Sequence, residues 1–302
     1  MKRYETPAAF REALEQRLRS SSASGVDYVR RRQLLVFDRF LARVFNTLGD
    51  AVTLKGGLAL ELRLERARTT KDVDLRVMGP PADLLRQLQA AARLSLSDFM
   101  EFHIAPDERN PEINNEGIRY EGRRFRASCR LAGKPYGQPF GVDVVFGDPL
   151  FFQPEVLQSD DYLGFAGIER TQVRVYPVAT HIAEKLHAYT MPRSHPNSRI
   201  KDLPDLALIA GSMSFTAEPL QSAIRQTFDF RGTHSAPTQL PAPPAEWKEP
   251  YARIAKDDAL PWSSILDVFN SAAAFLNPVL SGRTSIVWDP TRVQWSPSDG
   301  RD

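Results

Sequence analysis

Residues 54–57 read Leu-Lys-Gly-Gly, and residues 68–75 read Arg-Thr-Thr-Lys-Asp-Val-Asp-Leu. Residues 51–54 predict a short strand before the glycines, and the strong helix formers of residues 58–65 predict a helix after them. Residues 72–78 alternate polar and apolar side chains, which predicts a half-buried strand. This order of strand, glycine pair, helix and aspartate-bearing strand decides the expected fold.

Two carboxylates stand at alternate positions of the second predicted strand. Period-two geometry places Asp72 and Asp74 on one face, with Val73 and Leu75 on the other. Neighbouring carboxylates repel each other unless a cation lies between them, and hard oxygen ligands at this spacing suit Mg²⁺. Taken alone, such a pair is more often two solvated carboxylates at a strand edge.

The glycine pair supplies the second half of a possible nucleotide site. Gly56 and Gly57 allow backbone N–H groups to approach a polyphosphate closely, and the N-terminus of the following helix adds partial positive charge. Lys55 can supply a point charge to the same phosphates. A glycine pair between strand and helix is usually only a turn, so the prediction depends on its combination with the aspartates.

A third carboxylate is expected on a later strand. Residues 123–131 and 140–146 predict two strands, separated by turn-prone residues 133–137. Asp143 stands inside an otherwise apolar strand, where a charge costs free energy unless it is paired or bound to a metal. The alternative is an aspartate at a strand edge that faces water. Asp148, in a Gly-Asp-Pro sequence, is predicted to be a turn residue.

This layout resembles the nucleotidyltransferase superfamily, whose minimal pattern is Gly-Gly or Gly-Ser followed by Asp-x-Asp or Asp-x-Glu. Two later motifs narrow the resemblance: Glu-Lys-Leu-x-Ala at residues 184–188 and Arg-x-Lys-Asp-Leu-x-Asp-Leu at residues 199–206. Together the motifs resemble the AbiEii-type nucleotidyltransferase toxins, a family that includes the mycobacterial MenT toxins. The resemblance covers roughly residues 50–210, about half of the chain.

The resemblance implies a role for each matching residue. The paired aspartates would bind the catalytic Mg²⁺, the third carboxylate would act as metal ligand or general base, and the glycines would line the phosphates of an NTP. The implied catalytic residues are Asp72, Asp74, Asp143, Lys185, Asp202 and Asp205; the implied metal ligands are Asp72, Asp74 and Asp143; the implied nucleotide-binding residues are Lys55, Gly56, Gly57 and Thr70.

Two positions depart from the family pattern. Leu58 stands where many members have Ser or Thr, and Pro204 stands where an aromatic residue is common. Without the resemblance, Lys185 can be explained as a surface lysine paired with a neighbour. Asp202 can likewise be a helix cap before a proline, and Asp205 a first-turn acid that complements the helix dipole.

The composition excludes several classes of protein. The 302 residues carry a formal net charge of +2, which by itself does not indicate a nucleic-acid binder. Cys129 is the single cysteine, so disulfide frameworks and cysteine-based zinc sites are excluded. The five histidines show no metal-ligand spacing, and His187 and His195 are assigned no role. Because there is no apolar membrane span or signal core, we expect a soluble cytoplasmic protein.

Two groups of basic residues have alternative interpretations. The predicted helix at residues 27–48 carries five arginines that lie largely off its apolar stripe: Arg30, Arg31, Arg32, Arg39 and Arg43. The simpler interpretation is a solvated face, and the alternative is a surface that contacts nucleic acid. A second basic run is either a solvated strand face or a surface for an RNA backbone: Arg119, Arg123, Arg124, Arg126, Arg130 and Lys134. Of these, Arg124, Arg126 and Arg130 share one strand face.

The expected fold is α/β (α+β), a mixed sheet with flanking helices followed by a helical domain. We expect a nucleotidyltransferase domain over residues 1–165 and a mainly helical domain over residues 166–302. In the latter, helices are predicted at residues 178–189, 204–210, 217–228 and 262–276, with a proline-rich connector over 237–250 and a polar tail that ends at Asp302.

The expected activity is Mg²⁺-dependent transfer of a nucleotidyl group from an NTP to an RNA acceptor, with the tRNA 3′ end favoured. The resemblance implies a toxin that blocks translation and growth, and an antitoxin encoded nearby; direct binding of that antitoxin is left open. Two alternatives remain: a nucleotidyltransferase that acts on a protein or small molecule, and a catalytically idle relative that binds nucleotide or RNA. The complete Asp-x-Asp argues against the idle relative, while Leu58 keeps it open.

Overall fold

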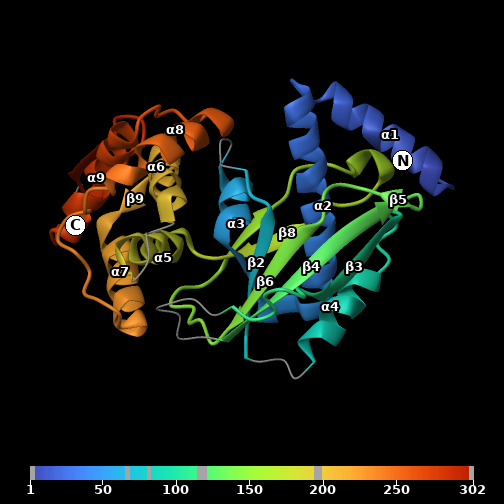
Figure 1. The fold of residues 1–302 in the computed structure, drawn as a ribbon, viewed down its shortest axis with the longest axis horizontal. Coiled ribbons are helices and arrows are strands. Elements are labelled where there is room, and N and C mark those ends of the chain that lie inside the picture. The colour runs from blue at the N-terminus through green and yellow to red at the C-terminus, as the bar shows by residue number, and fades with distance from the viewer. Residues whose placement is uncertain (1–3, 65–68, 80–82, 114–120, 194–198, 299–302) are drawn as a thin grey trace.

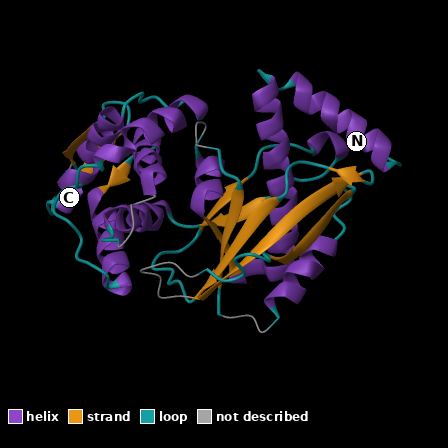
Figure 2. Cartoon of the chain, in the orientation of Figure 1, coloured by secondary structure: helices purple, strands orange, loops and turns teal. Residues whose placement is uncertain are grey.

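A mixed β-sheet forms the centre of the first half of the protein (Figures 1 and 2). The computed structural model describes residues 4–64, 69–79, 83–113, 121–193 and 199–298. The strands follow the order β3-β4-β6-β2-β1-β8-β7, and β5 pairs with β4. Their bounds are β1 (Val52–Lys55), β2 (Asp72–Val77), β3 (Met100–Pro106), β4 (Glu121–Leu131), β5 (Lys134–Pro135), β6 (Phe140–Phe146), β7 (Glu155–Gln158) and β8 (Gln172–Val175).

Helices cover one face of this sheet and leave part of the other open. The helices of this half are α1 (Pro7–Ser20), α2 (Gly25–Leu48), α3 (Gly56–Arg63) and α4 (Leu84–Arg93). α2 and α4 pack behind the strands, where Phe37 and Phe40 of α2 contact Phe140 of β6 (Figure 1). Side chains alternate along a strand, so Asp143, three residues after Phe140 on β6, faces away from α2 and α4. Arg124, its partner on β4, faces the same way.

The second half is mainly helical and has its own group of buried apolar side chains. Figure 1 shows this half beside the sheet, with α5 nearest to it. The helices are α5 (Val178–Thr190), α6 (Asp202–Ser212), α7 (Ala217–Arg231), α8 (Lys248–Asp257) and α9 (Ile265–Leu280). A small antiparallel sheet follows the order β11-β10-β9 and comprises β9 (Phe215–Thr216), β10 (Ile286–Asp289) and β11 (Gln294–Pro297).

The predicted mixed α/β fold is confirmed, including the strand, glycine pair, helix and strand of residues 52–77. The division at residues 165 and 166 stays a prediction. The buried side chains do form two clusters, but β8 still pairs with β1, and its Val173 and Val175 pack in the first cluster. Leu60 and Leu64, at the far end of α3, pack in the second cluster.

One prediction about the C-terminal region was wrong, that of the polar tail. The proline-rich connector packs onto the helices, because Leu240 and Trp247 are buried in the second cluster. The expected polar tail contains the β10–β11 hairpin, whose Trp288 is buried and donates a hydrogen bond from Nε1 to the carbonyl of Ala210 at 2.7 Å. Alternation in such short strands is too brief to predict them. His195 and Arg119 lie outside the described residues.

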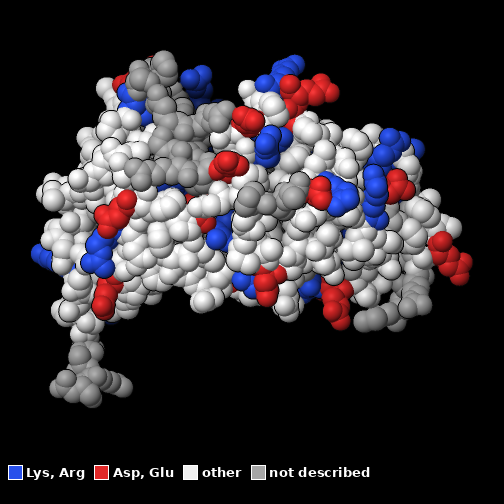
Figure 3. Space-filling view, turned by 90° about the horizontal axis from the view of Figure 1, so that it is seen from below, with Lys and Arg blue, Asp and Glu red and all other residues white. Residues whose placement is uncertain are grey.

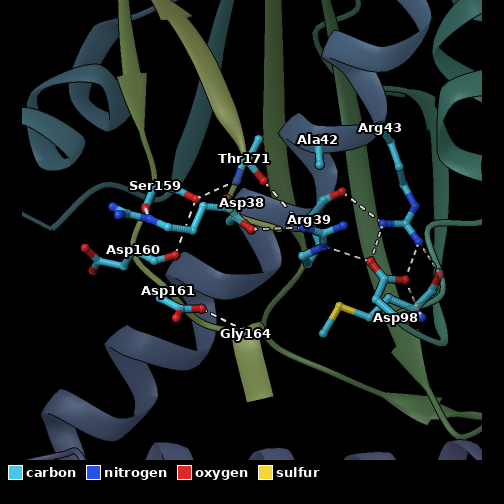
Figure 4. Close-up of polar contacts among 12 residues, drawn as sticks. Asp38, Arg39, Ala42, Arg43, Asp98, Ser159, Asp160, Asp161, Gly164 and Thr171 are labelled. Carbon is cyan, nitrogen blue, oxygen red and sulfur yellow. Dashed lines mark hydrogen bonds and ion pairs between the residues drawn. The ribbon is translucent and has the colours of Figure 1, made fainter. Parts of the chain in front are cut away.

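The interpretation of Arg39 and Arg43 as part of a solvated face was also wrong (Figure 4). Both side chains are buried and bind Asp98: Arg43 Nη2 lies 2.6 Å from Oδ1, and Arg39 Nε lies 2.8 Å from Oδ2. Burial raises the pKa of Asp98, but the hydrogen bonds and charges of the two arginines outweigh it and lower the pKa below its usual value. α2 is therefore packed against the rest of the protein along its apolar stripe and also on the side that carries Arg39 and Arg43.

The segment around Asp98 is held in a strained backbone conformation. Ser97 and Phe99, on either side of it, have φ values of 58° and 55°, in the left-handed region that non-glycine residues rarely adopt. Such conformations persist only where the surrounding contacts determine them. The paired arginines supply these contacts.

Within the described part of the chain, no helix has the length and apolar character needed to span a membrane.

We predict that Asp98→Ala lowers the free energy of unfolding by about 3–5 kcal/mol, because it leaves Arg39 and Arg43 buried without their carboxylate. Urea denaturation followed by tryptophan fluorescence measures the change. The matched control is Asp83→Ala, which removes an exposed ion pair with Arg86 and should shift stability by no more than about 0.5 kcal/mol. Equal effects of the two substitutions would contradict the structural role of Asp98.

Candidate active site

A cleft of about 570 Å³ lies between the open face of the sheet and helices of the second half. Residues from β1, β2, β4 and β6 line one side, and residues from α5, α6 and α7 line the other. Of the residues predicted for the site, those lining the cleft are Lys55, Gly56, Gly57, Thr70, Asp72, Asp74, Asp143, Lys185 and Asp202. Asp205 is buried behind this lining and contacts Lys185. The structure thus brings the predicted residues together.

Strand register places the three predicted carboxylates side by side. β2 runs parallel to β6, with Asp74 directly opposite Asp143, and Asp72 lies two residues earlier on the same face. Lys55 is the antiparallel partner of Asp74 on β1. Directly opposite residues on adjacent strands have Cβ atoms roughly 5 Å apart, so these side chains interact strongly.

The crowding of negative charge perturbs the central aspartate. Burial and the neighbouring carboxylate of Asp143 raise the pKa of Asp74 to about 6, and Asp72 adds to the effect while Lys55 opposes it. An added cation would relieve this repulsion. Asp74 therefore has the electrostatic character expected of a side chain that shares a cation with its neighbours.

Two glycines leave room for the carboxylates. A Cβ atom on Gly56 would lie 1.9 Å from Asp74 Oδ2, and the φ of +70° at Gly56 also disfavours any other residue. A Cβ atom on Gly141 would lie 2.5 Å from Asp72 Oδ1, which instead accepts a hydrogen bond from the Gly141 amide at 3.2 Å. The carboxylates are thus packed against glycine backbone, where an added Cβ atom would displace them.

The donor set fits a hard divalent cation. Asp72 and Asp74 offer only oxygen, and both oxygens of Asp143 accept from Arg124, at 2.9 Å from Nε and 3.0 Å from Nη2. Among the described residues, no group of three or more His, Cys, Asp or Glu side chains is arranged to hold a metal by itself. Mg²⁺ commonly takes one or two carboxylates and completes its shell with water and phosphate oxygens. A site built on Asp72 and Asp74 would be of this kind.

The opposite wall carries a buried lysine between two carboxylates. Lys185 Nζ lies 2.6 Å from Asp205 Oδ2 and 3.1 Å from Asp202 Oδ1. Burial lowers the pKa of Lys185, but the two aspartates raise it above its usual value, so the ammonium group stays charged. Two of the simpler interpretations do not hold, because Lys185 is not a surface lysine and Asp202 makes no capping hydrogen bond. Asp205 does lie in the first turn of α6, as predicted. Asp202 Oδ2 is buried without a hydrogen-bond partner among the described residues.

The segment that precedes Asp72 is anchored by α3. The Thr70 amide donates to Glu61 Oε2 at 3.2 Å, and its hydroxyl donates to the Asp72 carbonyl at 3.3 Å. Arg30 of α2 in turn holds Glu61 at 2.8 Å. Leu58, the departure from the family pattern, is buried in the first core. The Ser or Thr hydroxyl that many family members carry at this position would therefore lie on the side of α3 that faces the core.

Sequence reasoning missed several charged residues in or beneath the cleft, among them Asp148, Glu184 and Arg231. Asp148, predicted as a turn residue, is buried and lies 2.5 Å from Lys55 Nζ. Glu184 lies 3.1 Å from the same nitrogen, and Arg231 of α7 contacts both carboxylates. Glu184 lies inside the Glu-Lys-Leu motif, which was a usable signal. Nothing in the local sequence distinguishes Arg231 from an ordinary helix-end arginine.

A mixed sheet that carries a glycine-started helix and an Asp-x-Asp strand, faced by a buried lysine, defines a nucleotidyltransferase fold. The family model for the nucleotidyl transferase AbiEii toxin of type IV toxin–antitoxin systems matches residues 39–270, and the chain belongs to this family. The match includes most of both halves, so the family assignment does not rest on the aspartate motif alone.

One solved structure shares the fold at low sequence identity, and two others are more weakly similar. MenT4, a nucleotidyltransferase toxin from Mycobacterium tuberculosis H37Rv, is 16% identical with a TM-score of 0.58, over 99% of this chain and 95% of that chain. JHP933 and a putative nucleotidyltransferase, both from Helicobacter pylori, are each 14% identical, over 82% of this chain and 92% of those chains, with TM-scores of 0.46 and 0.43. No curated protein sequence gives a significant match.

We predict that Gly56→Ala abolishes nucleotidyl transfer and lowers stability, because the new Cβ displaces Asp74 in addition to straining the backbone. The matched control is Gly133→Ala, which has the same φ of +70° but open space around the new Cβ. Strain alone should cost each variant about 1–3 kcal/mol. Urea denaturation and a transfer assay separate the two effects, and an active Gly56→Ala enzyme would contradict the packing argument.

We predict that Asp74→Asn stabilises the metal-free protein at pH 7.5 by about 1–3 kcal/mol. The pKa of Asp74 is about 6 in the folded protein against 3.8 for an ordinary aspartate, so the folded state binds the proton more tightly and ionisation destabilises it. The advantage of Asn should shrink as pH falls from 6 towards 4. Thermal unfolding in EDTA, at pH 7.5 and again near pH 4, measures the difference in stability between the two proteins. An Asn variant that is less stable than wild type at pH 7.5 would contradict the prediction.

Proposed function

We propose that the protein transfers a nucleotidyl group from an NTP to an RNA acceptor, favouring the tRNA 3′ end, and thereby blocks translation and growth. Membership of the AbiEii toxin family supports the reaction class. The observation that carries the proposal is the convergence of Asp72 and Asp74, the start of α3 at Gly56 and the buried Lys185 on one cleft. These are a cation site, a phosphate site and a fixed positive charge.

The charges of the cleft support a requirement for Mg²⁺. The cleft lining as a whole carries more cations than carboxylates, but Asp72, Asp74 and Asp143 lie together on its sheet side, where Arg124 forms an ion pair with Asp143. A bare triphosphate would be repelled by these three carboxylates unless a cation lay between them. Asp72 and Asp74 would hold the ion, which when bound neutralises phosphate charge and stabilises the attacking and leaving oxygens.

The protein groups then bind and orient the reactants. The amides of Gly56 and Gly57 face the phosphates at the positive end of α3, and Lys185 adds a fixed charge from the opposite wall. The hydroxyl oxygen of the acceptor bonds to the α-phosphorus, and the bond from that phosphorus to the bridging oxygen breaks, which releases pyrophosphate. Asp143, oriented by Arg124, is proposed as metal ligand or as the base that takes the hydroxyl proton.

The open face of β4 is the proposed surface for the RNA backbone. Arg126 and Arg130 are exposed there on the same strand face as Arg124, which itself turns to Asp143. Figure 3 shows basic and acidic side chains interspersed on the face of the molecule seen from below. The described surface seen there has no broad patch of one sign, so RNA binding would depend on a few local cations and fall with salt.

The family also supports a toxin whose cognate antitoxin is encoded nearby, as its type IV toxin–antitoxin description implies. A protein or small-molecule acceptor remains the alternative within the same chemistry. The buried position of Leu58 weakens the idle alternative, because this departure from the family pattern lies in the core.

We predict that the wild-type protein labels tRNA at its 3′ end from at least one of the four NTPs, and only when Mg²⁺ is present. Asp72→Asn should lower labelling at least 100-fold, because one of two proposed cation ligands is lost. Gel analysis of radiolabelled tRNA, with protein lysate as the competing acceptor, measures the outcome.

We predict that the double substitution Arg126→Ala/Arg130→Ala weakens the labelling of tRNA and flattens its salt dependence. The control is Arg86→Ala, which removes another exposed arginine.

Other outcomes decide between the alternatives. Label that appears only in protein would contradict an RNA acceptor while retaining nucleotidyl transfer. No label in any acceptor, together with growth inhibition that Asp72→Asn leaves unchanged, would favour the idle relative.

A further inference from the structure

Four charged side chains of alternating sign form a closed ring at the floor of the cleft. Lys55 Nζ lies 2.5 Å from Asp148 Oδ2 and 3.1 Å from Glu184 Oε2. Arg231 Nη2 lies 3.3 Å from Asp148 Oδ1 and 2.8 Å from Glu184 Oε1. Each cation therefore contacts both carboxylates, and the ring has no net charge.

The ring joins the two halves of the protein. Lys55 ends β1 and Asp148 follows β6, so both belong to the sheet. Glu184 lies on α5 and Arg231 is the last residue of α7, so both belong to the helical half. Each half contributes one cation and one carboxylate. The ring closes only when α5 and α7 are seated against the sheet.

The ring is only partly open to the cleft, and one of its acids is bound further. The exposed fraction of the side chain is 2% for Asp148, 7% for Arg231, 12% for Lys55 and 17% for Glu184. The Tyr176 hydroxyl donates to Asp148 Oδ2 at 2.8 Å, and Lys55 Nζ lies 4.9 Å from the centre of the Tyr176 ring. Burial raises the pKa of Asp148, but Lys55 and Arg231 outweigh it and keep the carboxylate ionised. Charges so buried are costly to leave unpaired.

The ring is joined to the start of α3 through Lys55. Lys55 is the N-cap residue of α3, with no capping hydrogen bond from its side chain, and Gly56 follows it directly. The side chain of Lys55 is held by Asp148 and Glu184 instead. Because backbone and side chain move together, these contacts fix the direction in which the Gly56 and Gly57 amides point.

We propose that Arg231 is a positioning residue of the phosphate site: by pairing with Glu184 and Asp148 it balances their charge around Lys55, and so holds the start of α3 towards the nucleotide. The inference rests on the proposed function and extends the site to α7, a helix that follows the last of the sequence motifs and contains none of them. Removing Arg231 leaves Lys55 between two carboxylates, one buried and one partly exposed, with an excess negative charge. Removing the charge of Glu184 as well restores a neutral Lys55–Asp148 pair.

Binding of Mg²⁺-tripolyphosphate tests the proposal, since this probe carries the phosphates of every NTP and needs no acceptor. Isothermal titration calorimetry on the full chain should show at least a 10-fold loss of affinity for Arg231→Met. Arg231→Met/Glu184→Gln should recover to within about three-fold of wild type. The control Arg225→Met removes an exposed arginine of the same helix and should leave affinity unchanged.

The double variant separates positioning from direct contact. If Arg231 itself bound the phosphates, loss of the Glu184 charge would not rescue affinity, and the proposal would be overturned. Affinity unchanged in Arg231→Met would also overturn it. If that variant does not fold, Arg231→Gln replaces it: we expect a raised KM for the NTP with kcat retained, whereas an unchanged KM overturns the proposal. Wild type that binds tripolyphosphate but transfers no nucleotide would refute the proposed function alone.

Discussion

The repulsion among carboxylates on one face of the sheet is the constraint on which the site depends. Parallel pairing of β2 and β6 sets Asp74 against Asp143, and alternation adds Asp72 to the same face. Burial and, after it, the close packing of like charges raise the pKa of Asp74, and the repulsion creates the demand for a cation. The surrounding structure holds these groups where they repel: Gly56 and Gly141 leave them space, and Arg124 occupies both oxygens of Asp143.

Charge compensation across the cleft relates the two halves. The ring of Lys55, Asp148, Glu184 and Arg231 spans both halves, whereas Lys185 on α5 is paired within the helical half, between two aspartates of α6. Buried ion pairs contribute little net stability, since desolvation offsets their attraction, but they strongly disfavour arrangements in which one partner is missing. Such pairs therefore specify how the helical half sits against the sheet. The family match, which extends over both halves, accords with a site that needs both.

Local pattern predicted the elements that carry the site. Strict alternation over residues 72–78 and the glycine turn before α3 are properties of a few neighbouring residues, so strand, turn and helix could be predicted directly. The residues that line the cleft were largely predicted too, through the order of motifs. The same reasoning failed where a polar residue was buried by a distant segment. Arg39 and Arg43 look solvated on a helical wheel, but the strained segment around Asp98 covers them.

The sequence by itself determined the fold class, the pair of aspartates and the glycine that must stand beside them, because these follow from backbone periodicity and from the absence of a side chain. Only the tertiary structure decided the partners of the buried charges. Asp148 and Arg231 are far apart in the chain, and each is unremarkable in its own segment. Their pairing arises because the sheet and α7 bring them within hydrogen-bond distance out of water, where an unpaired charge is too costly to keep.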